Sequence, residues 1–275
     1  MKNKKQELRI KNQGLNKILT EIIEKKKGDL IKQKKEISLS ELKDFVSNLG
    51  VAHGFFKKNI LEAKDTALIA EIKLASPAEP LFGPTVEIMD QAKIYEDAGA
   101  DCISYITEKY FFKGDVASII KIAAKVKLPI IQKDFVVDEY QIYEAKIVGS
   151  SALLLIARLV DEEKLRKLVK LCIELGIEPV VEINDQEDLD KSLGTNANII
   201  AVNARDLSTF EVDVDKACKL MKKIPARFIK LGFSGVNSSV EVKKYQNSGA
   251  QGVLVGTSFM KSKNIKKFVK ELKNL

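Results

Sequence analysis

The chain has 275 residues, of which 45% are hydrophobic and 31% charged, enough for one large core or two smaller domains. No apolar run approaches the roughly 20 residues that a membrane-spanning helix needs, and the basic N-terminus lacks the apolar segment and cleavage site of a secretory signal. Cys102, Cys172 and Cys218 are odd in number, far apart and without a C-x-x-C pair, so we expect reduced thiols in a cytoplasmic protein with no membrane partner.

The net charge of +8 raises the question of a nucleic-acid partner. The lysines are spread over helix-like segments, and no run interleaves basic with aromatic residues. We therefore favour a lysine-rich solvated surface and expect no nucleic acid, with a basic nucleic-acid-binding protein as an alternative.

His53 is the only histidine. It has no partner for a metal site or a Ser/His/Asp triad, so we expect no metal and place His53 on the surface or in a loop.

Residues 1–65 carry a helical pattern. Apolar residues recur at three- and four-residue steps between positions 15 and 23, as they do on one face of a helix. Ser38 and Glu41 then supply a start signal for a second helix, which we predict from Glu41 to Leu49. Because no strand pattern interrupts this part of the chain, we expect residues 1–66 to form an N-terminal helical extension packed on the remainder.

After Ala67, short apolar runs alternate with longer amphipathic ones. The predicted strands are Leu68–Lys73, Cys102–Ile106, Ile130–Lys133, Ala152–Ile156, Pro179–Glu182, Ile199–Asn203, Phe228–Gly232 and Gly252–Val255. The predicted helices are Val86–Ala98, Val116–Val126, Glu139–Val148, Glu162–Leu175, Gln186–Leu193, Val214–Lys223, Ser239–Ser248 and Ile265–Leu272. This alternation is typical of a parallel α/β fold.

Glycines mark the passage from helix to strand. Gly99, Gly149 and Gly249 each follow a predicted helix and precede a predicted strand, where a left-handed residue ends the helix. Eight strand–helix units favour a closed barrel over an open doubly wound sheet, and no G-x-G-x-x-G follows an early strand. We predict an α/β protein: an eight-stranded parallel (βα)8 TIM barrel over residues 67–275 as catalytic domain, preceded by the helical extension.

The first predicted strand ends in two opposite charges. Glu71 and Lys73 are two residues apart after a continuous apolar run, so their side chains point to the same side. Desolvating both is costly unless they pair with each other or serve a ligand. This stretch alone leaves a structural ion pair and a functional site equally open.

Polar residues also end other predicted strands. Lys133, Glu182 and Asn203 each follow a buried run, and the C-terminal strand ends of a barrel meet on the face where such folds keep their chemistry. Their convergence with Glu71 and Lys73 favours a functional site over separate caps or ion pairs. Lysines and carboxylates together in a partly dry mouth suit a lysine acid and a carboxylate base or charge stabiliser.

The last two strand ends carry small residues instead. Ser234-Gly235 and Gly256-Thr257 leave backbone N–H groups accessible to an anion, and barrels often bind phosphate after their seventh and eighth strands. We therefore predict a phosphorylated small-molecule substrate.

Several long runs give the chain a family resemblance. It resembles the indole-3-glycerol phosphate synthases in IAEIKLASP (69–77), YEDAGADCISYITEKYFFKGD (95–115), LPIIQKDFVVDEYQIYEAKIVGSSALLLIA (128–157), VVEINDQEDL (180–189), IIAVNARDLSTFEVD (199–213) and SGAQGVLVGTSFM (248–260). The resemblance implies a carboxy-lyase of tryptophan biosynthesis. Its substrate would be 1-(2-carboxyphenylamino)-1-deoxyribulose 5-phosphate, and ring closure would release carbon dioxide and water without a cofactor.

The resemblance also implies residue roles. Lys133 matches the general acid that protonates the ketone oxygen, and Lys73 matches a lysine that contacts the anionic groups and takes part in dehydration. Glu71 and Glu182 match carboxylates that stabilise the cationic intermediate and serve as base. Asn203 matches the amide that positions substrate hydroxyls and a catalytic carboxylate.

Other positions match the binding segments of the family. Ser76 and Arg205 lie in substrate-site segments, and the phosphate loops match Ser234, Gly235, Gly256 and Thr257. Candidates for the wall of an aromatic-ring pocket are the apolar residues Phe82, Phe111, Phe112, Phe135 and Leu231.

Two departures from the family pattern stand out. Phe233 precedes Ser234-Gly235 where the usual motif is E-S-G, so one carboxylate is missing, and the first loop has Ala78-Glu79-Pro80 with Gly83 delayed where the usual motif is SPS-x-G. We expect activity. The alternatives are a non-catalytic phosphate-ligand-binding paralogue of the same barrel and a barrel isomerase acting on a related phosphosugar, and the sequence leaves monomer and homodimer open.

Overall fold

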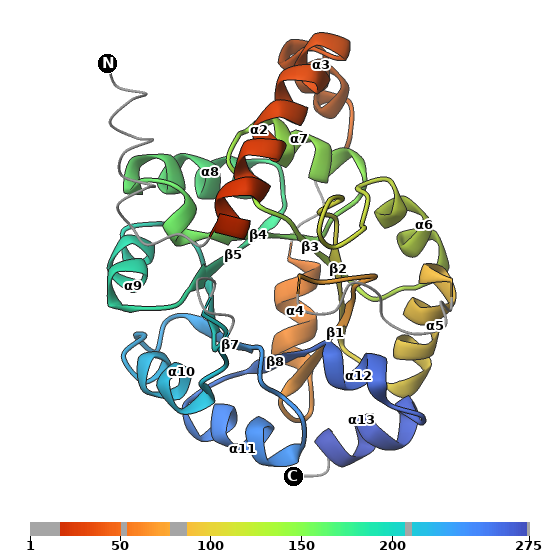
Figure 1. The fold of residues 1–275 in the computed structure, drawn as a ribbon, viewed down its shortest axis with the longest axis vertical. Coiled ribbons are helices and arrows are strands. Elements are labelled where there is room, and N and C mark those ends of the chain that lie inside the picture. Colours follow the sequence, from red (N-terminus) through yellow and green to blue (C-terminus); the bar gives the residue numbers. More distant parts are fainter. Residues whose placement is uncertain (1–16, 51–53, 78–86, 207–210, 274–275) are drawn as a thin grey trace.

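The computed structural model describes residues 17–50, 54–77, 87–206 and 211–273. In these ranges, parallel strands close into one barrel in chain order, with β8 paired to β1, and helices form an outer ring (Figure 1). The strands are β1 (Ala67–Ile72), β2 (Cys102–Ile106), β3 (Ile130–Lys133), β4 (Ala152–Ile156), β5 (Glu178–Ile183), β6 (Ile199–Asn203), β7 (Ile229–Phe233) and β8 (Gly252–Val255). The predicted eight-stranded (βα)8 barrel is confirmed.

The predicted bounds hold for β2, β3, β4, β6 and β8, and each of the other three strands differs by one residue at both ends. β1 ends at Ile72, so Lys73 follows the strand, and β7 ends at Phe233. The barrel helices are α5 (Ile88–Ala98), α6 (Ser118–Lys125), α7 (Tyr140–Ile147), α8 (Glu162–Glu174), α9 (Gln186–Leu193), α10 (Val214–Met221), α11 (Ser239–Asn247), α12 (Thr257–Lys261) and α13 (Ile265–Lys273). A short 3-10 helix, η1 (Ala157–Leu159), follows β4.

Continuous apolar runs form the strands because both strand faces are covered. Every residue of β1 is buried, which a strand between a barrel interior and an outer helix layer requires. Gly99 ends α5 with a left-handed backbone at φ 94°, and Gly249 adopts the same φ after α11. These turns confirm the predicted left-handed glycines after the helices, since residues with a Cβ rarely adopt this conformation, although α11 ends one residue earlier than predicted.

Within residues 17–50 and 54–66, the helices that precede the barrel are α2 (Lys17–Glu36), α3 (Leu39–Ser47) and α4 (Phe55–Glu62). The predicted start of the second helix at Glu41 was two residues late. Ser38 is the N-cap, and its side chain accepts from the backbone of Glu41, whose carboxylate accepts from the Ser38 backbone. This capping box places Glu41 inside the first turn. Sequence analysis did not identify α4 as a separate helix.

α2 and α3 lie beside α7 at one side of the barrel (Figure 1). Lys26 of α2 forms a buried ion pair with Asp134, with Nζ 2.8 Å from Oδ1. The Asp134 carboxylate also accepts from the Thr107 hydroxyl at 2.7 Å. α4 contacts the start of β2 instead, where the Asn59 side chain donates to the Asp101 carbonyl at 3.0 Å. The contact with Asp134 joins α2 to the residue that follows Lys133.

None of the helices in the described ranges combines the length and apolar character needed to cross a membrane. Cys102, Cys172 and Cys218 are buried free thiols. His53 and Phe82 lie outside the residues that the structure describes, as do positions 78–80 and 83 of the first barrel loop.

Lys26→Ala should destabilise the protein, because Asp134 would remain as a buried carboxylate without its cation. Breaking such a pair costs about 3 kcal/mol of unfolding free energy, which urea denaturation at pH 7 measures. Lys34→Ala is the matched control. Lys34 lies on α2, as Lys26 does, and it pairs with Asp138, but both side chains of this pair are about one-third exposed. The control should lose about 0.5 kcal/mol. Equal losses in the two variants would contradict the role given to the Lys26 pair.

Candidate active site

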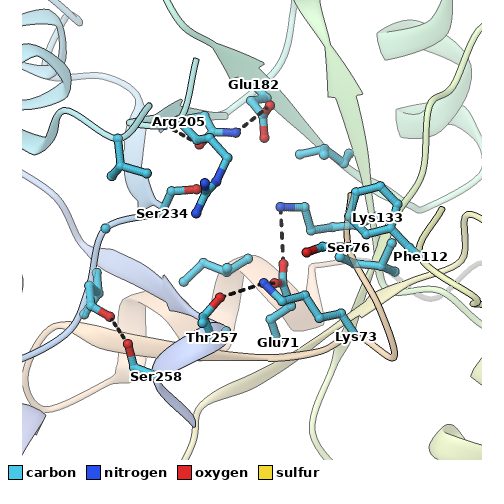
Figure 2. Close-up of a pocket in the computed structure, with 18 of the residues that line it drawn as sticks. Glu71, Lys73, Ser76, Phe112, Lys133, Glu182, Arg205, Ser234, Thr257 and Ser258 are labelled. Atoms are coloured by element: carbon cyan, nitrogen blue, oxygen red, sulfur yellow. Dashed lines mark hydrogen bonds and ion pairs between the residues drawn. The ribbon is translucent and has the colours of Figure 1, made fainter. Parts of the chain in front are cut away.

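A cavity of about 520 Å³ opens at the C-terminal ends of the strands. Its lining includes all the residues predicted to be catalytic or to bind the substrate and its phosphate: Glu71, Lys73, Ser76, Lys133, Glu182, Asn203, Arg205, Ser234, Gly235, Gly256 and Thr257. Figure 2 shows Lys133 and Glu71 facing each other across the floor, with Arg205 beside Ser234. The closed barrel therefore brings together residues that lie far apart in the chain.

The Glu71 carboxylate lies between two ammonium groups. Lys73 Nζ is 3.3 Å from Glu71 Oε1, and Lys133 Nζ is 3.5 Å from Oε2. Lys73 also donates to the Thr257 hydroxyl at 3.0 Å (Figure 2). Burial alone would raise the pKa of Glu71, but the charges of Lys73 and Lys133 outweigh it, and the pKa of this carboxyl lies below its ordinary value. Glu71 is therefore ionised at neutral pH and holds the ammonium of Lys133 in the mouth.

Glu182 has the opposite environment. Its Oε1 accepts from the Asn203 amide at 3.1 Å, whereas its buried Oε2 has no hydrogen-bond partner. Burial raises the pKa of Glu182 above its ordinary value, against the opposing effects of Lys133 and Asn203. A carboxyl with a raised pKa and one unsatisfied oxygen suits proton exchange with a ligand in the cavity.

Asn184 supports Asn203 and was missed by sequence analysis. Its amide donates to the carbonyls of Asn203 at 2.8 Å and Arg205 at 2.9 Å. Asn184 follows Glu182 by two residues. The side-chain alternation used to place Glu71 and Lys73 on one side could therefore have placed Asn184 on the same side as Glu182.

The loops after β7 and β8 form the other side of the cavity. Ser234 has a φ of 68°, a conformation that residues with a Cβ rarely adopt. The Tyr245 hydroxyl of α11 donates toward its carbonyl at 3.0 Å. A side chain on Gly235 would overlap Val214, and one on Gly256 would overlap the Glu71 carboxylate. Both glycines let backbone come close to the cavity.

Apolar residues form a wall opposite these loops. Phe112 and Phe135 line the cavity with ring centroids 6.4 Å apart. Glu108 shapes the loop before Phe112 by accepting from the backbone N–H groups of residues 110–112. Two of the candidates for this wall were wrong: Leu231 is fully buried in the core, and Phe111 lies outside the lining.

Ser258 and Lys261 line the cavity from α12, and Lys261 was not predicted from the sequence. A helix of five residues is too short to show a periodic pattern. In the described part of the chain, no group of three or more His, Cys, Asp or Glu could hold a metal ion.

Gly256→Ala should lower stability, because the new methyl group would displace the Glu71 carboxylate from its two lysines. Overpacking of this kind costs about 1–3 kcal/mol of unfolding free energy, measured by urea denaturation. Gly28→Ala is the control, since nothing lies within 4 Å of a Cβ at that position in α2. It should gain up to about 1 kcal/mol from helix propensity. A neutral effect at Gly256 would refute the close approach.

Known proteins match nearly the whole chain. The family model described as indole-3-glycerol phosphate synthase matches residues 19–272. The chain is 38% identical to the indole-3-glycerol phosphate synthase of Aliarcobacter butzleri over 94% of this chain and 98% of that protein. It is 38% identical to that of Caldanaerobacter subterraneus subsp. tengcongensis over 93% and 99%, and 33% identical to that of Lachnoclostridium phytofermentans over 94% and 99%. The chain belongs to the indole-3-glycerol phosphate synthase family.

Proposed function

We propose that this chain closes the indole ring of 1-(2-carboxyphenylamino)-1-deoxyribulose 5-phosphate with loss of carbon dioxide and water. The observation that carries the proposal is the meeting of Lys133, from β3, and Glu182, from β5, in one cavity with Glu71 and Lys73. An acid and a base in one partly dry site are what condensation followed by dehydration requires. The family to which the chain belongs supports a phosphorylated substrate, as do the cationic side chains of Arg205 and Lys261 in the cavity lining.

Lys133 acts as the general acid of the condensation. Its Nζ carries a proton in the cavity, and Glu71, 3.5 Å away, holds the ammonium toward the bound ketone oxygen. As the ring carbon attacks, the proton passes to that oxygen. Loss of the carboxylate follows, and the ionised Glu71 stabilises the positive charge that accumulates on the ring system.

Glu182 acts as the base of the dehydration. The free Oε2 takes a proton from the intermediate, while Asn203 holds Oε1 and fixes the plane of the carboxylate. Lys73, held at Thr257, contacts the anionic groups of the substrate and protonates the departing hydroxyl. Because Glu71 and Glu182 have pKa shifts of opposite sign, two similar carboxylates take different roles.

The two ends of the substrate bind on opposite sides of the cavity. The phosphate binds at Ser234-Gly235 and Gly256-Thr257. Arg205 and Ser76 contact the polar groups of the substrate. The carboxyphenyl ring packs on Phe112 and Phe135. Fixing both ends brings the reacting carbons together and removes much of the entropic cost of ring closure.

Residues 1–66 serve as an extension of a barrel domain that spans residues 67–275. The buried pair between Lys26 and Asp134 supports this division, because it connects α2 directly to the strand end that carries Lys133. The three buried free cysteines favour a reducing, cytoplasmic location.

Phe233 favours a second candidate, a phosphate-ligand-binding paralogue without catalysis, since a carboxylate is missing next to the phosphate loop. The comparisons lend it no support. Fluorescence of the indole product, followed after addition of the synthetic substrate, separates the two functions. Turnover supports the synthase, whereas substrate binding by calorimetry without product supports the paralogue.

Lys133→Met should remove the acid and lower kcat by about 10²–10⁴. It should also lower the unfolding midpoint, because the buried Glu71 loses one of its two cations. Fluorescence of the indole product gives the rate, and thermal unfolding checks the fold. Lys125→Met on the outer helix α6 is the control, because its side chain is about half exposed and lies outside the cavity. Full activity of Lys133→Met would rule out the proposed acid.

Glu182→Gln should lower kcat by about 10²–10⁴ while making the protein more stable above neutral pH. Since the folded pKa of Glu182 lies above 4.5, its ordinary value, the wild type loses stability as pH rises from 4.5 through the raised pKa. Glutamine cannot ionise, so the gain appears at pH 8 and disappears at pH 4. Urea denaturation at both pH values measures this gain in stability. Glu174→Gln is the control, because the side chain of Glu174 is about half exposed. No difference between pH 4 and pH 8 would contradict the raised pKa.

A further inference from the structure

Phe233 contacts the ammonium of Lys133. Lys133 Nζ lies 4.8 Å from the centroid of the Phe233 ring, within the range of a cation–π interaction. The two residues end β3 and β7, which are four strands apart in the eight-stranded barrel, so their side chains meet across its interior. The ring therefore contacts the ammonium from the opposite side of the barrel and not from an adjacent strand.

Phe233 is buried, and its backbone is held by two hydrogen bonds. Its side chain has no solvent exposure, and its carbonyl accepts from the Ala204 N–H at 2.8 Å. The Tyr245 hydroxyl lies 3.2 Å from the same carbonyl. Phe233 is absent from the cavity lining, whereas Lys133 belongs to it. A buried ring contributes more to a cation–π contact than an exposed one, because water does not reach its face.

The chemistry of the ring differs from that of a carboxylate at the same place. An aromatic face attracts a positive charge but has no lone pair to accept its proton. Glu71 already supplies one anionic partner for Lys133 at 3.5 Å. A second carboxylate would compete with a ligand for the N–H donors of the lysine, whereas the ring leaves them available.

We propose that Phe233 is a positioning residue for Lys133: the face of its ring holds the ammonium in the cavity with its protons directed to the substrate. The proposal rests on the proposed function, in which Lys133 is the general acid. It gives a physical reason for phenylalanine at this position, where the sequence departs from the family motif.

The test replaces Phe233 with mono-, di- and trifluorophenylalanine. Fluorine withdraws charge from the ring face with little change in size, so the series weakens the attraction for an ammonium stepwise. The rate of a single turnover, measured by fluorescence of the indole product, should fall stepwise to about one-tenth in the trifluoro protein. KM and the unfolding midpoint should change little. Phe56 of α4 is equally buried, and the same series there serves as control.

Phe233→Leu gives a second, genetically simple readout, because leucine is apolar but has no ring face. Its single-turnover rate should fall at least as far as that of the trifluoro protein, with KM within about twofold. A flat rate across the fluorinated series in an active wild type overturns the proposal, as does a fall that the Phe56 series reproduces. Absence of product from the wild type would instead refute the proposed function.

Discussion

The site depends on one buried carboxylate shared by two ammonium groups. Glu71 comes from β1, Lys73 follows the same strand, and Lys133 comes from β3. A buried charge is costly unless it is paired, and this one is paired twice. The closed barrel makes the arrangement attainable, because the C-terminal ends of strands that are not neighbours face one mouth. Without Glu71, two ammonium groups would repel each other there.

The same constraint separates the two glutamates. Glu71 is ionised by its lysines, whereas Glu182 is held by an amide and has an unpaired oxygen, so burial dominates its pKa. The groups around each carboxyl therefore make Glu71 a permanent anion and Glu182 a proton acceptor. The Gly256 backbone completes it, since a side chain there would displace Glu71.

Much of this could be predicted from the sequence because barrel strands are buried on both faces. Their apolar runs located every strand to within one residue, and the polar residues after those runs identified Glu71, Lys133 and Glu182. Contacts across the barrel were beyond reach, because spacing along the chain says nothing about them. The ring of Phe233 under Lys133 is the main example. Short elements such as α12 were missed because five residues show no periodicity.

The N-terminal helices belong to the same physical picture. α2 reaches the strand end after Lys133 through Lys26 and Asp134, both largely buried. The position of the proposed acid is therefore set from three directions: by Glu71, by the ring of Phe233 and by the anchored residue that follows it. Redundant support of this kind keeps a long, flexible lysine side chain in one orientation.

A crystal structure of the protein with the reaction product, indole-3-glycerol phosphate, tests the central claim most directly. The account predicts the phosphate within about 3 Å of backbone N–H groups at Gly235 and Thr257, and the indole ring against Phe112. It also predicts Lys133 Nζ and Glu182 Oε2 on the same ligand. A product bound with either of these two groups turned away from it would contradict the account.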